Sequence, residues 1–197
     1  MSSAPSRSNA DPVDQALVAA VAAVTARIVA VGASNPAVVI DGRSGAGKSS
    51  LARRLVSAWP GRGRVQLVAL DDVYPGWDGL AEGVQYARET ILLPHARGLL
   101  GVWQRWDWEA GTRAEAYAVD PSLPLVVEGA GILTPEVARL VDVSVWVEAP
   151  TTSRRHRALS RDGDTYRPHW QRWALQEDAH LEEHSPAERA DVRVRIP

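Results

Sequence analysis

The stretch "VVIDGRSGAGKSSLARRL", from Val38 to Leu55, decides the fold. A short β-branched run leads into a glycine-rich turn at 42–49, and an amphipathic helical pattern follows the turn. The turn reads G-x-x-x-x-G-K-S, which is the pattern of a phosphate-binding loop between a strand and a helix. Its glycines let successive backbone N–H groups face one anion, because no Cβ stands in the way. The stretch therefore predicts a phosphate-binding loop.

The loop also contains the only lysine in the chain. The sequence has 22 basic residues, and all of them except Lys48 are arginine. An ammonium is a compact point charge on a thin stem, whereas a guanidinium is a wide planar fork, so the two cations are not interchangeable at a tight site. The lysine favours a loop that binds phosphate over the alternative, a glycine-rich turn that binds nothing.

The loop pattern assigns ATP and Mg²⁺ as the expected cosubstrate and metal. Lys48 is expected to reach the β- and γ-phosphates, and the hydroxyl of Ser49 is expected to hold the metal. The residues predicted to contact the phosphates are Gly42, Arg43, Ser44, Gly45, Ala46, Gly47, Lys48, Ser49, Ser50 and, farther along the chain, Arg154.

The composition is that of an ordinary globular domain. The chain has 197 residues and a formal net charge of −2, with 45% hydrophobic and 23% charged residues. These values predict one domain with a substantial core, and the charge gives no indication of a nucleic-acid or membrane partner. The chain has no cysteine, which excludes disulfides and thiolate metal sites and fits a reducing cytoplasm. The oligomeric state, including a homo-oligomer, stays open.

The start of the chain divides into a tail and a helix. Residues 1–10 are rich in Ser, Pro and Ala and are predicted to be disordered, without the layout of a signal peptide. Asp11 and Pro12 are typical of a helix start. The apolar run from Ala16 to Ala33 includes a threonine and an arginine, so we expect a helix that packs on a core rather than a membrane span. Residues 11–197 are predicted to form a single domain.

Short apolar runs alternate with helical patterns along the rest of the chain. This alternation is typical of an α/β domain in which helices cover both faces of a parallel sheet, a three-layer αβα arrangement. The predicted helices are 48–59, 84–105, 135–140 and, with breaks, 153–184. The predicted strands are Val38–Asp41, Val65–Leu70, Leu125–Glu128, Val143–Val147 and Val192–Ile196.

Phosphate-binding loops occur in kinases, ATPases and GTPases, and two features narrow the class. GTPases of the common type read guanine with an N-K-x-D stretch, which needs a second lysine, and the LSGGQ signature of transporter ATPases is absent. Motor and transporter ATPases use ATP to move a further domain, and a chain of this length shows none. Its length therefore favours a small-molecule kinase.

Acidic residues follow two of the predicted strands. Asp71 and Asp72 end the second strand, and Glu128 ends the third, at the edge where open α/β sheets place ligands. An aspartate there can activate an acceptor hydroxyl, and Glu128 is positioned to hold a water bound to Mg²⁺. Which aspartate acts stays open, and Glu128 could also be a plain acid in a turn.

Three arginines are spaced three and four residues apart, at Arg154, Arg157 and Arg161. This spacing places them on one face of a helix. They are therefore predicted to form a short lid over the transferring phosphoryl group. The alternative is a solvated basic face paired with nearby acids.

The motifs together resemble the uridine kinase-like group of P-loop kinases, which is also similar to phosphoribulokinase and bacterial pantothenate kinase. The loop is shared by many families, but the ordered set is more specific and runs across nearly the whole chain from Val38. The matching pieces are "GRSGAGKSS", "LDDVY", "RWDWEAGTR", "VVEGAGIL", "RHRALSRD" and "ADVRVRIP".

The resemblance implies a P-loop fold with a five-stranded parallel sheet, in the order 2-3-1-4-5 when strands are counted along the chain. It implies a cytoplasmic kinase that transfers the γ-phosphoryl group of ATP to a hydroxyl, with a nucleoside as the expected acceptor. The implied catalytic residues are Lys48, Asp71, Arg157 and Arg161. The implied acceptor residues are Asp72, Tyr74, Asp78, Trp106, Trp108 and Arg113.

The chain departs from the family where a nucleoside is held. The stretch D-H-P-[DN]-A-F-D, whose acid holds the ribose hydroxyls, is not recognisable, and Asp78 is the only obvious candidate for its role. Gly111 stands where a pocket histidine is usual. The tryptophan pair could stack a base or belong to the core.

Two alternatives therefore stay open. The first is a nucleoside monophosphate kinase that holds the acceptor's own phosphate with Arg88, Arg97 or Arg113. The second is an ATP-binding regulatory protein with slow ATPase activity.

The last third of the chain contains four histidines that we interpret as surface residues: His156, His169, His180 and His184. Two tryptophans there, Trp170 and Trp173, are interpreted as apolar contacts of a helix.

Overall fold

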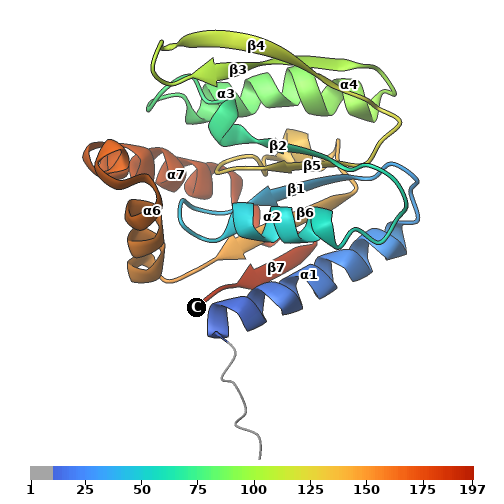
Figure 1. Cartoon of the computed structure of the whole chain (residues 1–197), viewed down its shortest axis with the longest axis horizontal. Coiled ribbons are helices and arrows are strands. Elements are labelled where there is room, and N and C mark those ends of the chain that lie inside the picture. The colour runs from blue at the N-terminus through green and yellow to red at the C-terminus, as the bar shows by residue number, and fades with distance from the viewer. Residues whose placement is uncertain (1–10) are drawn as a thin grey trace, which may run out of the picture.

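Five parallel strands form the central sheet (Figure 1). The computed structural model describes residues 11–197, without the side chains of residues 162 and 164, so the disordered tail predicted at 1–10 lies outside the described residues. The sheet order is β2-β5-β1-β6-β7. Its strands are β1 (Ala37–Asp41), β2 (Gln66–Ala69), β5 (Leu125–Glu128), β6 (Val143–Glu148) and β7 (Val192–Arg195).

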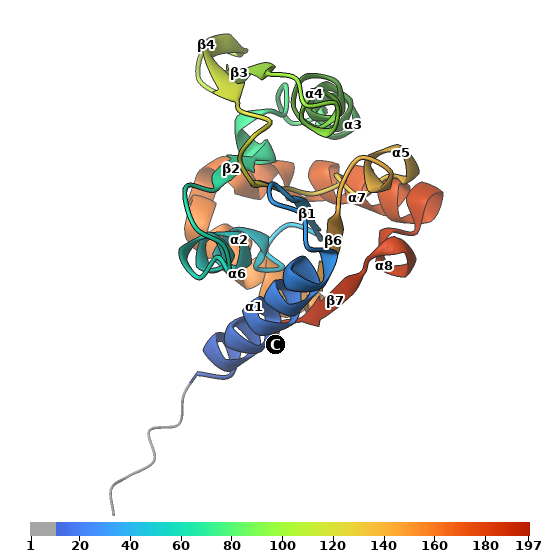
Figure 2. The ribbon, with the colours of Figure 1, turned by 90° about the vertical axis from the view of Figure 1, so that its right-hand side faces the viewer.

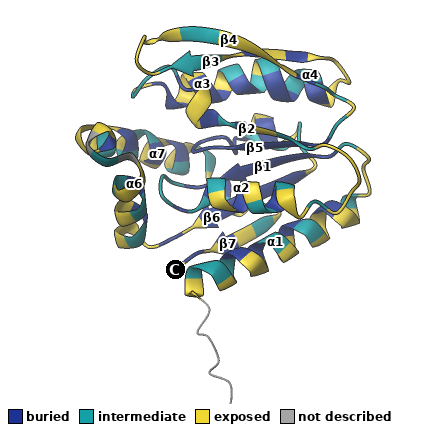
Figure 3. Cartoon of the chain, viewed as in Figure 1, coloured by how far each residue is buried: buried dark blue, intermediate teal, exposed yellow. Residues whose placement is uncertain are grey.

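The strand numbers differ from the expected 2-3-1-4-5 because two further strands, outside this sheet, lie between β2 and β5 in the sequence. Counted along the chain, the five sheet strands stand in the expected order. In the centre of the sheet, Val39 lies opposite Val127 on one side and Ser144 on the other. Burial on both faces explains the continuous apolar runs of the central strands β5, β1 and β6, whereas the edge strands β2 and β7 are partly exposed (Figure 3).

Helices cover both faces of the sheet, as Figure 2 shows. Helices α1 (Pro12–Val31) and α2 (Lys48–Ser57) lie on one face, where they pack with Val38 and Ile40 of β1. Val39 faces the opposite core, because successive strand residues point to opposite faces. The helices of that second face include α5 (Pro135–Ala138), α7 (Trp170–His184) and α8 (Pro186–Arg189).

Helix α1 begins with a capped turn and packs on the sheet. The Asp11 carboxylate accepts a hydrogen bond from the Val13 N–H at 3.1 Å, and Gly32 ends the helix with a φ of 70°. One face of the helix is buried against α2, β6 and β7. By length and mean hydropathy, 1.7 over its most apolar window, α1 would also be long enough to cross a membrane, a property that core helices share.

The predicted helix 84–105 was wrong in its second half. The chain forms α3 (Leu80–Ala87), a π-helical turn and α4 (Leu93–Ala96), and Gly98, with a φ of 69°, then turns it into strand β3 (Gly101–Asp107). Strand β3 pairs with β4 (Thr112–Val119) as an antiparallel hairpin. The hairpin lies over α3 and α4, beyond the β2 edge of the sheet (Figure 1).

The predicted breaks within 153–184 are present. Helix α6 (Thr151–Tyr166) contains a kink at Gly163, whose φ of 57° and ψ of −134° are not helical. A short 3₁₀ turn joins α6 to α7. The break lets α6 stand at the loop end of the sheet while α7 runs back along one face (Figures 1 and 2).

Candidate active site

The glycine-rich loop joins β1 to α2 in the form that its sequence predicts. Gly42, Gly45 and Gly47 have φ values of 151°, 75° and 107°, which residues with a Cβ rarely adopt. A Cβ at Gly45 would also collide with the backbone carbonyl of Arg154. Lys48 is only 8% exposed, and its Nζ donates to the carbonyl oxygen of Arg43 at 3.3 Å. The loop is thus closed around its lysine.

A buried aspartate that sequence reasoning missed holds the start of this loop. Asp41, the last residue of β1, accepts hydrogen bonds from the N–H groups of Gly42, Gly131 and Leu133 at 2.6–2.8 Å. Its second oxygen lies 3.0 Å from Nε2 of His180, a residue expected at the surface but only 7% exposed. Asp41 therefore ties the loop to the segment after β5 and to α7.

A second missed acid, Glu177 of α7, holds the next part of the loop. Its carboxylate is 3% exposed and accepts from the Ser44 N–H at 2.6 Å and from Nε of Arg43 at 3.1 Å. Asp178 forms an ion pair with the Arg43 guanidinium, with its Oδ1 2.7 Å from Nη1. Arg43, predicted to contact phosphate, is thus placed against α7 by its side chain.

Glu128 and Ser49 meet at the carboxyl end of the sheet, where a metal is expected. The carboxylate of Glu128 is 5% exposed; burial raises its pKa, and Lys48 and a hydrogen bond with Ser49 oppose that rise. Carboxylate and hydroxyl oxygens suit Mg²⁺, which takes one or two protein ligands and otherwise binds phosphates and water. Among the described residues there is no cluster of three His, Cys, Asp or Glu that could hold a metal ion by itself.

Three of the four arginines of α6, Arg154, Arg157 and Arg161, face the loop, but they differ in what they contact. Arg154 is buried and donates to the carbonyl oxygens of Ala149 and Ser44 at 3.2 and 3.3 Å. Arg157 donates from Nε to the Gly45 carbonyl at 2.8 Å, and burial lowers its pKa. Its buried Nη2 has no hydrogen-bond partner among the described residues, a donor left for an anion.

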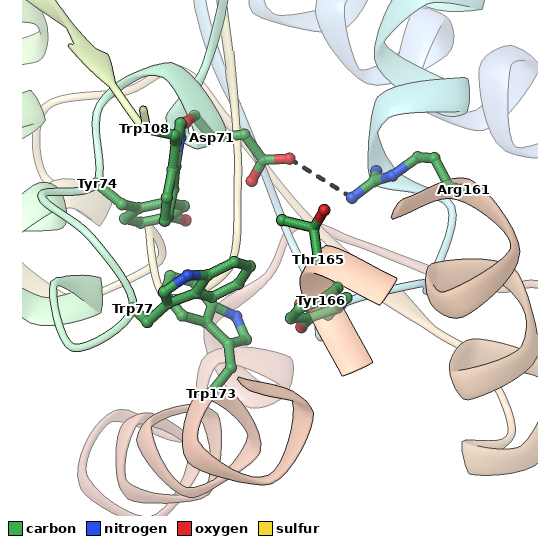
Figure 4. A pocket seen from close by; sticks show the side chains of 9 residues that line it. Asp71, Tyr74, Trp77, Trp108, Arg161, Thr165, Tyr166 and Trp173 are labelled. Carbon is green, nitrogen blue, oxygen red and sulfur yellow. Dashed lines mark hydrogen bonds and ion pairs between the residues drawn. The ribbon is translucent and has the colours of Figure 1, made fainter. Parts of the chain in front are cut away.

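Two cavities meet at this end of the sheet. The smaller, of about 230 Å³, lies over the loop. The larger, of about 420 Å³, lies beside it and is largely aromatic (Figure 4). Asp71, Arg161 and Ser44 line both. The loop cavity is lined by Ser44, Gly45, Gly47, Lys48, Ser49, Ser50, Asp71, Glu128, Arg157, Ala158 and Arg161, and the aromatic cavity by Ser44, Asp71, Tyr74, Trp77, Trp108, Arg161, Thr165, Tyr166 and Trp173.

Asp71 stands between the two cavities on a 3₁₀ turn that follows β2, Leu70–Asp72. Its carboxylate is 62% exposed and lies 3.7 Å from Nη2 of Arg161 (Figure 4). The indole N–H of Trp108, from the hairpin, donates to the Asp71 backbone carbonyl at 2.8 Å. The neighbouring Asp72 lines neither cavity; partial desolvation, and then the charge of Asp71, raise its pKa.

Three residues expected around the acceptor contact other groups. Asp78 forms an ion pair with Arg172 at the surface. Arg113 donates to the Val73 carbonyl at 2.8 Å, and its guanidinium carbon lies 3.8 Å from the centre of the Tyr86 ring and 5.6 Å from that of Trp106. Arg113 and Trp106 therefore brace the hairpin and do not line the aromatic cavity.

The aromatic cavity also contains residues that sequence reasoning did not assign to it. Trp77 lies in the stretch "PGWDG", which was interpreted from the sequence only as a turn. Tyr166 and Thr165 end α6, and Trp173 was interpreted as an apolar contact of its helix. Local composition could have indicated them, because aromatic residues are numerous just after Asp71 and Asp72 and again around 166–173.

Comparisons with known proteins give the fold. No family model matches the chain, and no curated protein matches it. The solved structure of a possible uridine kinase from Bacillus stearothermophilus has a TM-score of 0.66 at 21% identity and covers 90% of this chain and 98% of its own. A candidate fructose transport system kinase from Silicibacter sp. TM1040 has a TM-score of 0.56 at 17% identity, covering 88% and 98%. The YGR205w protein has a TM-score of 0.52 at 11% identity, covering 94% of each chain. The fold is that of the uridine kinase-like P-loop kinases.

Proposed function

We propose that this chain, with its uridine kinase-like P-loop fold, is a kinase that transfers the γ-phosphoryl group of ATP to a hydroxyl of a small molecule. The single observation that carries the proposal is the position of Asp71, which lines the loop cavity and the aromatic cavity together. A carboxylate at that boundary can accept the proton of an acceptor hydroxyl while the phosphates lie on its other side.

The loop side supplies cations and donors for the phosphates. Lys48, Gly45 and Gly47 line the cavity in which the β- and γ-phosphates are expected, and Nη2 of Arg157, which has no partner among the described residues, adds a donor there. The N–H groups of Gly42 and Ser44 are already bonded to Asp41 and Glu177. Mg²⁺ bound beside Ser49 and Glu128 would neutralise charge on the phosphate oxygens. Arg161, at the boundary, is placed to follow the transferring group toward the acceptor.

The transfer step balances with these groups alone. The acceptor oxygen forms a bond to the γ-phosphorus, and the bond from that phosphorus to the bridging oxygen breaks. ADP leaves with the electron pair, and the hydroxyl proton passes to Asp71. Asp71 is preferred to Asp72 for this role because Asp72 lines neither cavity.

The alternatives receive less support from the contacts. A nucleoside monophosphate kinase needs cations for a second phosphate, yet Arg161 is the only described cation that lines the aromatic cavity. A regulatory ATP-binding protein has no need of a carboxylate between two cavities. A nucleoside acceptor rests on the family resemblance, because Asp78 and Arg113 contact other groups.

The test is ADP release from ATP and Mg²⁺ with nucleosides, nucleoside monophosphates, pantothenate and sugars added singly. Lys48→Ala is the blank, and Asp71→Asn is expected to keep ATP binding while turnover falls by about a hundred-fold or more. Asp72→Asn is the matched control and is expected to keep most activity. Normal turnover by Asp71→Asn would refute the role of Asp71. ATP binding with no turnover of any acceptor, including those named below, would favour the regulatory alternative.

A further inference from the structure

The aromatic walls of the larger cavity form a corner rather than a slot. The rings of Trp77 and Trp108 meet at 53°, those of Tyr74 and Trp173 at 72°, and those of Trp77 and Trp173 at 89°. Their centroids are 4.9, 4.9 and 6.3 Å apart. Trp77 also stacks nearly parallel on Tyr166 at 5.3 Å and on His169 at 4.3 Å, and these distances leave no space for a flat ring between the stacked pairs. Such a corner fits a rounded group that touches several rings at once (Figure 4).

Several carboxylates lie near the tyrosines of this corner. Burial raises the pKa of the Tyr74 phenol well above its usual value, and the carboxylates of Asp71, Asp41, Glu128 and Glu177 raise it further. Burial also raises the pKa of Tyr166; a hydrogen bond with Ser44 and the charge of Arg161 oppose the rise, while Glu177 and Asp71 add to it. Among the described side chains that line the cavity, Asp71 and Arg161 are the only charged ones, and they pair with each other.

The described lining includes no Asn, Gln or His to read the edge of a base. Asp78, the candidate for ribose hydroxyls, is bound to Arg172, and Arg113 is bound to Val73. The hydrogen-bonding side chains of the lining include Ser44, Asp71, Arg161 and Thr165. Polar groups of a nucleoside that these do not reach would have no side-chain partner in the described lining, which costs binding free energy.

We propose that the acceptor is an amino alcohol whose tertiary or quaternary ammonium group sits in the aromatic corner while its hydroxyl points to Asp71. The proposal rests on the kinase function and names its substrate class. Aromatic faces attract such cations, most strongly where water is excluded. At about 420 Å³ the cavity has room for a substituent beyond a trimethylammonium group. The hydroxyl oxygen takes the γ-phosphoryl group, ADP leaves with the electron pair, and Asp71 takes the proton.

Binding without turnover tests the ammonium site by itself. Calorimetry compares choline with its neutral isostere, in which carbon replaces nitrogen, and tetramethylammonium chloride with potassium chloride. Choline is expected to bind about tenfold or more tightly than the isostere, and tetramethylammonium is expected to bind where potassium does not. Equal affinity for choline and its isostere, or no binding of either, would overturn the proposal.

Matched variants locate the site. Trp108 is 40% exposed, so Trp108→Leu should fold and should lose the preference for choline. Trp108→Phe, which keeps a ring but loses the N–H bond to Asp71, should retain part of the preference. Trp59→Leu, in the opposite core, is the control and should leave the preference unchanged. A full preference in Trp108→Leu would overturn the assignment of the corner.

Turnover separates the two proposals. ADP release with choline and with its benzyl-substituted analogue, above the rates with nucleosides and sugars, would support both. Turnover of a nucleoside or sugar with no ammonium binding would overturn the amino alcohol class and leave the kinase standing. Ammonium binding with no turnover of any alcohol would overturn the kinase and, with it, the assignment of the ligand as an acceptor.

Discussion

The loop cavity and the aromatic cavity share a wall but are built in different ways. Around the loop, Asp41, Glu177 and Arg154 are each 5% exposed or less and each is hydrogen-bonded to the loop backbone. Around the acceptor, Asp71 is 62% exposed and Trp108 is 40% exposed. The loop side is fixed before any ligand arrives, as suits a phosphate common to every reaction of this kind. The aromatic side is mixed: Tyr74 and Trp173 are buried in the core, while Asp71 and Trp108 are exposed and can change with little effect on the loop.

The substitution expected to have the largest effect on the loop side is Asp41→Ala. The change leaves three N–H groups and His180 without their buried acceptor. We therefore expect the free energy of unfolding to fall by about 3–5 kcal/mol. Urea unfolding measures the loss. Asp14→Ala is the control: Asp14 pairs with Arg54 at 2.7 Å but is 48% exposed, and its loss should cost less than about 1 kcal/mol. Similar losses in the two variants would contradict the comparison.

Lys48→Arg tests whether the loop needs the narrow cation. The lysine is buried over the loop, where a guanidinium fork has no room to replace it, so turnover should fall by about a hundred-fold. The melting temperature should fall modestly, because the larger guanidinium overpacks a buried position although the charge is kept. Steady-state kinetics at saturating ATP measure the effect. An arginine variant with near-normal turnover would show that the single lysine is an accident of composition.

Glu177→Gln separates the two cavities by their kinetic constants. The variant weakens the anchor of Arg43 and Ser44, so the KM for ATP should rise about tenfold while the KM for the acceptor stays nearly unchanged. Asp178→Asn removes the other, 57% exposed, partner of Arg43 and should have a smaller effect. Trp108→Leu should show the reverse pattern. Equal changes in both KM values for Glu177→Gln would mean that the two sides are not independent.

The smallest expected effect is the pH dependence of Asp72. Because its pKa is raised in the folded protein, the folded state holds that proton more tightly than the unfolded state. The resulting stability is present below the unfolded pKa and is lost as pH rises through the folded pKa. Asp72→Asn should therefore melt slightly higher than the natural protein at neutral pH and no higher at a pH where Asp72 is protonated. Thermal scans at both pH values check this, and a higher melting temperature at acid pH would contradict it.

The sequence was sufficient for the parts that are local in the chain. The loop, its lysine and the sheet strands lie in short stretches whose pattern needs no partner to be interpreted, and so does the position of Asp71 just after a strand; the choice between Asp71 and Asp72 was left open. The hairpin was missed because its strands do not alternate regularly between apolar and polar residues. The helical spacing of apolar residues that starts at Val84 also continues past Gly98 in the sequence. In the folded chain, Trp103 and Tyr117 stack across the hairpin at 5.1 Å, a contact between residues far apart in the sequence.

The missed site residues have a common physical reason. Glu177 and His180 look like members of a polar helix face, "LQEDAHLEEH", until α7 is placed against the loop. Asp41 looks like a strand end, and its three N–H partners come from two segments. Trp77 and Tyr166 meet only because α6 kinks and returns, with their rings stacked at 5.3 Å. Sequence spacing along one element cannot show contacts of this kind.

Helix α7 presents Trp173, Glu177 and His180 at positions i, i+4 and i+7, on one face. The first lines the aromatic cavity, the second holds the loop, and the third holds Asp41 behind it. Any coupling carried by this helix is reciprocal: if ATP changes the affinity for the acceptor by some factor through α7, the acceptor must change the affinity for ATP by the same factor. Cooperativity between donor and acceptor, measured as the ratio of acceptor Kd values with and without nucleotide, would then be a property of one helix.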